Sequence, residues 1–224
     1  MSFGTFSADP QATWLTAPAD PTDRNMELLR DFWFRDPAGT MWLAPKGSVV
    51  NGASIPAPLW STVGSPYTGA YRRASIVHDV ACDQAVHAPD PKAARAAADH
   101  MFYQACRAGG CPASQAELLY VGVRLGAWMP YVPLWSKSLQ PMHEALLATD
   151  RTMPDVPEES LRTTYREIAV ELQARPAEAR PFRQLEALVD RHLRAKAAQP
   201  VSRAPRAAAT RTTRPRATRT KAKP

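Results

Sequence analysis

The residues best suited to chemistry are the adjacent pair His78–Asp79, which follows the apolar pair Ile76–Val77. Neighbours on a helix point about 100° apart, so His78 shares a face with Cys82 while Asp79 does not. A site can still form at the edge between these faces if a second element supplies a ligand, and we expect Asp99 to do so. A His-Asp pair with a distant Asp suits a divalent metal that activates water, and His78 alone could serve as a general base.

A second arrangement has Ser54 as nucleophile, His78 as base and an aspartate as orienter. Ser54 lies in the segment "NGASIP", which lacks the G-x-S-x-G pattern of common serine hydrolases. HD-type phosphohydrolases need a further upstream histidine, and none precedes His78, so that class is excluded. In the non-catalytic alternative, His78 and Asp79 hydrogen-bond the backbone of "NGASIP" and tie this loop to the helix.

A weaker metal candidate combines Cys106 and Cys111 with His100. The chain has only three cysteines and no Cys-x-x-Cys pair, so free, partly buried thiols are favoured over a zinc site. An odd number of cysteines also argues against a disulfide framework. The N-terminus lacks the pattern of a secretory signal, so we expect a location in a reducing cytoplasm.

Three helices are expected to position these residues. The first runs over 69–86 and carries His78. The second begins with Asp90 as N-cap and Pro91 at the first helical position, and ends at Gly109–Gly110. The third starts near residue 112 and ends before Pro130.

A small β structure is expected before the helices. The turn tetrapeptide at 36–39 predicts a hairpin between "MELLRDFWFRD" and "TMWLAP", and a short strand follows through Val49 and Val50. The third helix is apolar on nearly every side and begins an apolar run from Leu118 to Trp135, but Arg124, Pro130 and Pro133 interrupt this run. It is therefore predicted to be a buried core helix, and no transmembrane segment is expected.

Two amphipathic helices are predicted near the C-terminus, separated by Pro176. The first has Leu161, Ile168 and Leu172 on one face. The apolar positions of the second include Leu185, Leu188 and Leu193. These faces could pack on the body of the protein or on another copy of the chain.

The positive charge of the chain lies in its tail. The chain has 28 Lys and Arg against 21 Asp and Glu, yet no acidic residue follows Asp190. The tail contains almost no large apolar residue, so it is expected to be disordered and to contact nucleic acid non-specifically or an acidic protein. The basic residues assigned to this contact are Arg203, Arg206, Arg211, Arg214, Arg216, Arg219, Lys221 and Lys223.

Four segments together resemble domain-of-unknown-function family 1353, which is found in phages and prophages. In chain order they are "PKGSVVNGASIPAPLW", "YRRASIVHDVAC", "AADHMFYQAC" and "AELLYVGVRLGAW". The resemblance covers residues 26–129 and implies a phage or prophage origin and a compact α+β domain, but no established reaction. With that origin, the expected location is the host-cell cytoplasm, with attachment to a virion as the alternative. It carries over Ser54, His78, Asp79 and Asp99 as characteristic polar residues, and Asn51 stands where the family usually has aspartate.

The expected fold is α+β: a small N-terminal β hairpin or sheet packs on a bundle of about three helices, and two C-terminal helices and the tail follow. The predicted divisions are an extended arm (1–25), an α+β domain (26–135), a linker (136–157), a helical extension (158–196) and a disordered basic tail (197–224).

Two classes of function remain open. The first is a small hydrolase, with or without a divalent metal, built from His78, Asp79 and Asp99 with Ser54 and Asn51 nearby. The second is a non-enzymatic phage accessory or virion-associated binding protein whose basic tail contacts nucleic acid. The sequence does not fix the oligomeric state.

Overall fold

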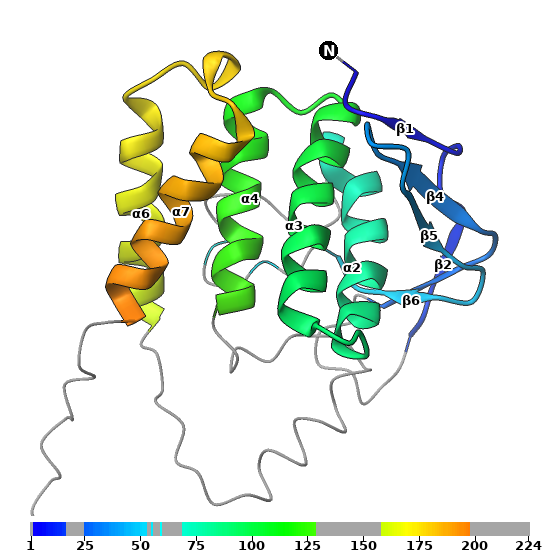
Figure 1. Ribbon diagram of the computed structural model, residues 1–224. Helices are drawn as coiled ribbons and strands as arrows, with labels where there is room; N and C mark the ends of the chain where they lie inside the picture. Colours follow the sequence, from blue (N-terminus) through cyan, green and yellow to red (C-terminus); the bar gives the residue numbers. More distant parts are fainter. Residues whose placement is uncertain are drawn as a thin grey trace, which may run out of the picture.

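The computed structural model describes residues 2–16, 25–52, 55, 59, 69–128 and 158–197. Within them the protein is α+β, as expected. Two small antiparallel sheets lie against the first long helix, and the remaining helices follow one another away from the sheets (Figure 1). The predicted linker, and the predicted tail apart from Ala197, lie outside the described residues.

Each sheet has three strands. One has the order β1-β4-β5, with strands Thr5–Phe6, Phe32–Arg35 and Met41–Ala44. The other has the order β2-β3-β6, with strands Ala12–Trp14, Met26–Leu28 and Val49–Val50. The predicted extended arm thus supplies β1 and β2, which pair with β4 and β3.

The predicted hairpin is β4 and β5, joined by the expected turn. Asp36 Oδ1 accepts from the backbone N–H groups of Ala38 and Thr40, both at 2.9 Å. Gly39 has a φ of 89°, which glycine adopts without a side-chain clash. The segment 26–36 differs from the expectation of one strand, because it forms β3 and β4 in different sheets.

Three helices form the centre of the molecule. Helix α2 spans Arg72–Val86 after a short 3-10 turn, η2, at Gly69–Tyr71. Helix α3 spans Pro91–Ala108 and α4 spans Ala113–Trp128. All three agree with the predicted helices to within a few residues. The N-cap prediction is confirmed, because the Asp90 side chain accepts from Ala93 N at 2.9 Å.

The core joins the sheets to α2 and continues through α3 to α4. Phe32 and Phe34 alternate inward from β4, since successive side chains of a strand face opposite sides. In α4, Leu119, Val123 and Leu125 are fully buried. No helix in the described part of the chain is long and apolar enough to cross a membrane.

Helices α6 (Glu158–Gln173) and α7 (Phe182–Ala197) pack on the outer side of α4 (Figure 1). A 3-10 turn, η4, at Ala177–Ala179 connects them. Of the predicted apolar positions, Leu188 is partly buried. The others are buried, namely Leu161, Ile168, Leu172, Leu185 and Leu193. These faces therefore pack on the body of the protein.

Candidate functional site

His78 on α2 faces Asp99 on α3. His78 Nε2 lies 2.8 Å from Asp99 Oδ1, and neither side chain has any exposed surface. The His78 ring also packs against Phe102, with 4.6 Å between ring centroids. The expectation that α3 brings Asp99 to the edge of the His78 face is confirmed. This approach is possible because small residues such as Ala98 and Ala105 are buried on α3.

Two arginines complete the contacts of Asp99. Arg95 Nε donates to Oδ1 at 3.1 Å, and Arg124 Nη1 donates to Oδ2 at 3.4 Å. Arg124 also donates from Nη2 to Asp190 Oδ1 on α7, at 3.0 Å. The cluster of His78, Arg95, Asp99, Arg124 and Asp190, called here the His-Asp cluster, joins α2, α3, α4 and α7. Its two arginines balance its two carboxylates.

Burial and the charges of the neighbouring arginines together set the protonation of His78 and Asp99. Burial lowers the pKa of His78, and the positive charge of Arg95 acts in the same direction. Burial alone would raise the pKa of Asp99, but the His78 hydrogen bond and the charges of Arg95 and Arg124 outweigh it and lower that pKa. At neutral pH, Asp99 is therefore ionised and His78 neutral. Because a carboxylate can only accept, His78 carries its proton on Nε2, and Nδ1 keeps its lone pair.

Cys82 lies one helical turn beyond His78. Its Sγ is 3.4 Å from Nε2 and 3.7 Å from Nδ1 of His78. Nearly equal distances to both nitrogens keep the sulfur away from the in-plane axis of either one. The Cys82 thiol is therefore not placed to give its proton to the lone pair of Nδ1.

The same residues are the candidate metal ligands. Among the described residues, one ligand atom each from His78, Cys82 and Asp99 lie within 4.8 Å of one another. Asp79, part of the predicted ligand set, does not belong to this group. An ion here would have to displace the N–H groups of Arg95 and Arg124 from Asp99, against the repulsion of two cations.

Asp79 points to the β6 side of α2. Its Oδ2 accepts the backbone N–H of Asn51 at 2.7 Å, across 28 positions of sequence. Of the two contacts expected in the non-catalytic alternative, the structure therefore has the one from Asp79 to the backbone of "NGASIP". His78 instead bonds Asp99.

Ser54 lies outside the described residues, as do all eight tail residues assigned to nucleic-acid contact. Three other residues of "NGASIP" are described, namely Asn51, Gly52 and Ile55. Asn51 contacts α2, and Ile55 is buried and lies so close to Gly122 on α4 that a Cβ there would be 3.2 Å from Ile55 Cγ2. The "NGASIP" segment thus contacts α2 near its start and α4 near its end.

The Cys106, Cys111 and His100 candidate is not assembled as a metal cluster in the described ranges. Both cysteines are buried free thiols, as the cysteine content predicts. The His100 ring stacks on Phe182 of α7 with 3.9 Å between centroids. It therefore helps to attach α7.

Sequence reasoning missed the two arginines of the His-Asp cluster. Arg95 is four residues before Asp99 on the same helix, the spacing at which opposite charges meet, so this signal was present in the sequence. From the sequence, Arg124 is recognisable only as an interruption of an apolar run. Its contacts with Asp99 and Asp190 depend on how three helices pack, which no local pattern encodes.

Comparisons with known proteins agree with the resemblance noted above. The family described as "Protein of unknown function (DUF1353)" matches residues 26–123. The uncharacterized protein y4jT of Sinorhizobium fredii (strain NBRC 101917 / NGR234) is 37% identical over 143 residues, which are 63% of this chain and 38% of that protein. The uncharacterized protein y4iH of the same strain is 35% identical over 104 residues, 46% of this chain and 41% of that protein.

The chain thus spans about two fifths of the length of these two relatives. No solved structure matches it.

Proposed function

We propose that the α+β domain is a small hydrolase in which His78 is the general base and Asp99 orients it. The observation that carries the proposal is the 2.8 Å bond from His78 Nε2 to Asp99 Oδ1. It holds a neutral imidazole in the tautomer whose Nδ1 can take a proton, as the aspartate does in acyl-transfer triads. Water, the smallest nucleophile, is the group that we expect this buried base to activate.

The arginines would stabilise negative charge that develops during such a reaction. Within the described residues, Arg95 Nη2 and Arg124 Nε are buried and have no hydrogen-bond partner. Buried donors that are held in place interact strongly with a forming oxyanion, because they need little reorganisation. This supports an ester or phosphoester as the substrate class. It also favours a metal-independent reaction over the divalent-metal version with His78, Asp79 and Asp99.

The test uses His78→Gln, because glutamine can still donate to Asp99 but cannot act as a base at neutral pH. The full chain is assayed with p-nitrophenyl acetate, p-nitrophenyl phosphate and bis-p-nitrophenyl phosphate, with and without zinc, manganese or magnesium. We expect hydrolysis of at least one ester, and a loss of about 10²- to 10⁴-fold in the variant.

The matched control is His87→Gln, on an exposed histidine that caps the C-terminal end of the same helix. It should keep the wild-type rate. A folded His78→Gln protein with the wild-type rate would contradict the assignment of the base. Activity that appears only with added metal would favour the metal-dependent version.

A second candidate function is supported by the complete burial of His78 and Asp99. In it the His-Asp cluster stabilises the packing of four helices, and the protein is a phage accessory or virion-associated binding protein in the host cytoplasm. The basic tail would then contact nucleic acid or an acidic partner. The sequence resemblance supports the phage or prophage origin.

The tail proposal is tested by the salt dependence of binding to labelled duplex DNA. A triple variant, Arg211→Ala, Arg214→Ala and Arg216→Ala, should reduce the slope of log affinity against log salt by about 0.9 per lost phosphate contact. An unchanged slope would exclude the tail as the contact.

A further inference from the structure

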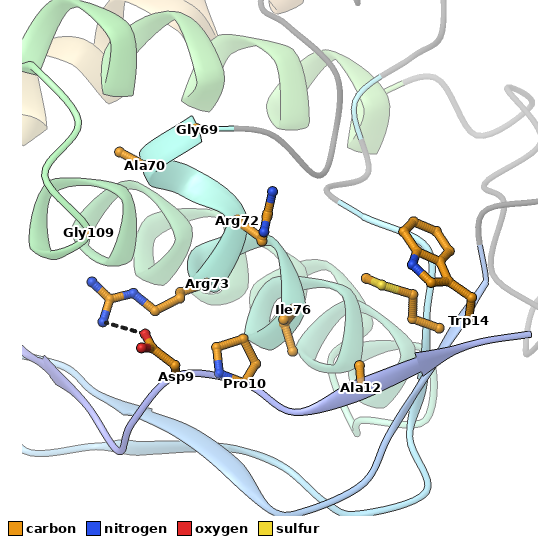
Figure 2. A pocket seen from close by; sticks show the side chains of 11 residues that line it. Asp9, Pro10, Ala12, Trp14, Gly69, Ala70, Arg72, Arg73, Ile76 and Gly109 are labelled. Carbon is orange, nitrogen blue, oxygen red and sulfur yellow. Dashed lines mark ion pairs between the residues drawn. The ribbon is translucent and has the colours of Figure 1, made fainter.

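A pocket on the sheet side of the molecule lies away from the His-Asp cluster, between the β1–β2 segment and the start of α2 (Figure 2). Its volume is about 550 Å³, within the range of about 300–1,000 Å³ that is typical of sites for small ligands. Its lining comes from β2, β3, η2, α2 and the end of α3.

An exposed aromatic ring forms one end of this pocket. Ala12 and Trp14 both line it, because alternate residues of β2 face the same side. Trp14 pairs in register with Met26 of β3, which also lines the pocket. The Trp14 side chain is 59% exposed. An indole held at the rim of a pocket offers a face on which another planar ring can stack.

Two arginines, Arg72 and Arg73, also line the pocket. Figure 2 shows Arg73 at the end opposite Trp14, with Arg72 and Ile76 between them. The Arg73 guanidinium is held over the Phe6 ring, 4.6 Å from its centroid. It also lies 4.0 Å from Asp9, whose side chain is 96% exposed.

The charge of this pocket favours an anion. A long and exposed ion pair such as Arg73–Asp9 contributes little, so Asp9 does not cancel the attraction of the site for a stronger anion. Among the described residues of the lining, Asp9, Arg72 and Arg73 are charged and leave one net positive charge. Arg72 is exposed at the first turn of α2, where helical N–H groups add a partial positive charge.

We propose that this pocket binds one nucleotide unit of a single-stranded nucleic acid, with the base stacked on Trp14 and the phosphate near Arg72 and Arg73. Aromatic stacking beside a cationic groove is the usual means by which proteins hold single strands without reading their sequence. A free nucleotide has the same chemistry. We favour a strand because it carries several phosphates, and the whole chain has an excess of positive charge, with 28 Lys and Arg against 21 Asp and Glu. The proposal is independent of hydrolysis at His78.

The test measures fluorescence anisotropy of a labelled oligothymidylate titrated with the full chain. Removal of the ring in Trp14→Ala should weaken binding by about 5- to 150-fold, the range expected for one base stacked on an aromatic ring. Trp14→Phe, which keeps an aromatic face, should restore most of the affinity. Circular dichroism should show an unchanged fold, since Trp14 is mostly exposed.

Charge variants give effects of opposite sign. Arg72→Ala should weaken binding several-fold and reduce the slope of log affinity against log salt by about 0.7, the value for one phosphate contact on a single strand. Asp9→Asn should bind as tightly as wild type or more tightly. Arg166→Ala, on the exposed face of α6, also removes one positive charge and is the matched control, with little effect expected.

Three results would overturn the proposal. In the first, Trp14→Ala and Arg72→Ala bind no more weakly than Arg166→Ala. In the second, thymidine monophosphate competes as well as the oligonucleotide at equal phosphate concentration, which would assign the pocket to a free nucleotide. In the third, polyglutamate competes equally well, which would mean that the site attracts any polyanion.

Discussion

The backbone N–H of Asn51 donates to Asp79 Oδ2 at 2.7 Å and joins the "NGASIP" segment to α2. The contact does not use the Asn51 side chain. The family that the sequence resembles is expected to have aspartate at this position, and the bond to Asp79 requires the side chain of neither residue. The change from aspartate to asparagine is therefore compatible with this connection, whatever role the aspartate has elsewhere.

Replacement of Asn51 and replacement of Asp79 should therefore change the free energy of unfolding by very different amounts. Asn51→Ala keeps the backbone donor and should change the free energy of unfolding by less than about 0.5 kcal/mol. Asp79→Ala removes the acceptor of the part-buried Asn51 N–H and should cost about 1–3 kcal/mol. Urea unfolding followed by circular dichroism measures both, with Asp83→Ala, one turn along α2, as the control. Equal losses for Asn51→Ala and Asp79→Ala would show that the Asn51 side chain is required.

The charge on Asp99 should matter more than the imidazole of His78. Asp99→Asn leaves Arg95 and Arg124 partly buried beside a neutral amide, and a broken buried ion pair typically costs about 3–5 kcal/mol. His78→Gln keeps a donor for Asp99 and should cost about 1–3 kcal/mol.

The double variant Arg95→Met with Asp99→Asn separates charge from packing. Within the described residues, Asp99 is the only ion-pair partner of Arg95. Removal of both charges should therefore cost less than the sum of the two single changes, by about 0.5–3 kcal/mol. Simple additivity in urea unfolding would mean that the two residues are not energetically coupled.

The positions of α3 and Asp99 and the buried faces of α6 and α7 follow largely from local sequence signals. Asp90 and Pro91 place the start of α3, and its helical spacing brings Asp99 opposite His78. The buried faces of α6 and α7 were likewise readable from apolar spacing. Each of these signals lies within about one or two helical turns, where side-chain direction follows from residue number alone.

The pairing of the strands and the contacts of Arg124 depend on segments that are distant in the sequence. β1 and β2 have too few residues to show an alternating pattern, and they are strands because β4 and β3 lie beside them. The separation of β3 from β4 likewise depends on which partner each strand finds. The sequence shows Arg124 as a charge in an apolar helix, but its partners Asp99 and Asp190 come from two other helices, α3 and α7.

Two adjacent glycines at the end of α3 should resist substitution for different reasons. A Cβ on Gly109 would lie 2.4 Å from the backbone oxygen of Ala70, which cannot move without displacing η2. Gly110 has open space around it but a φ of 97°. Gly109→Ala should thus lose about 1–3 kcal/mol through overcrowding, and Gly110→Ala about 1 kcal/mol through backbone strain.

Asparagine distinguishes the two causes, because it tolerates positive φ better than alanine does. Gly110→Asn should recover part of the stability that Gly110→Ala loses, whereas Gly109→Asn should be at least as damaging as Gly109→Ala. Thermal unfolding of the four variants provides the comparison. Recovery at Gly109 instead would mean that crowding against Ala70 is not its constraint.

The His-Asp cluster should also make stability depend on pH in a defined window. The pKa of His78 is lowered from 6.5 by burial, against the opposing effect of Asp99 and with the help of Arg95. As pH falls below 6.5, the unfolded chain binds a proton that the folded protein does not, so folding becomes less favourable until the folded pKa is passed. Each unit of difference between the two pKa values contributes about 1.4 kcal/mol.

Asp99 acts in the same direction but at lower pH. Its pKa is lowered from 3.8, since the His78 bond and the charges of Arg95 and Arg124 outweigh the effect of burial. Its contribution is present above pH 3.8 and is lost as pH falls through the folded pKa. His78→Gln should therefore flatten the stability curve just below pH 6.5, while the fall below pH 3.8 remains.

Urea unfolding of wild type and His78→Gln at several pH values measures this difference directly. His87→Gln, which removes an exposed histidine from the same helix, should keep the wild-type curve. If His78→Gln lost stability on acidification as steeply as wild type, the proton excluded from the folded protein would belong to another group. If instead the wild-type protein gained stability as the pH fell through this window, His78 would be charged in the fold. It could not then be the base that the hydrolase proposal requires.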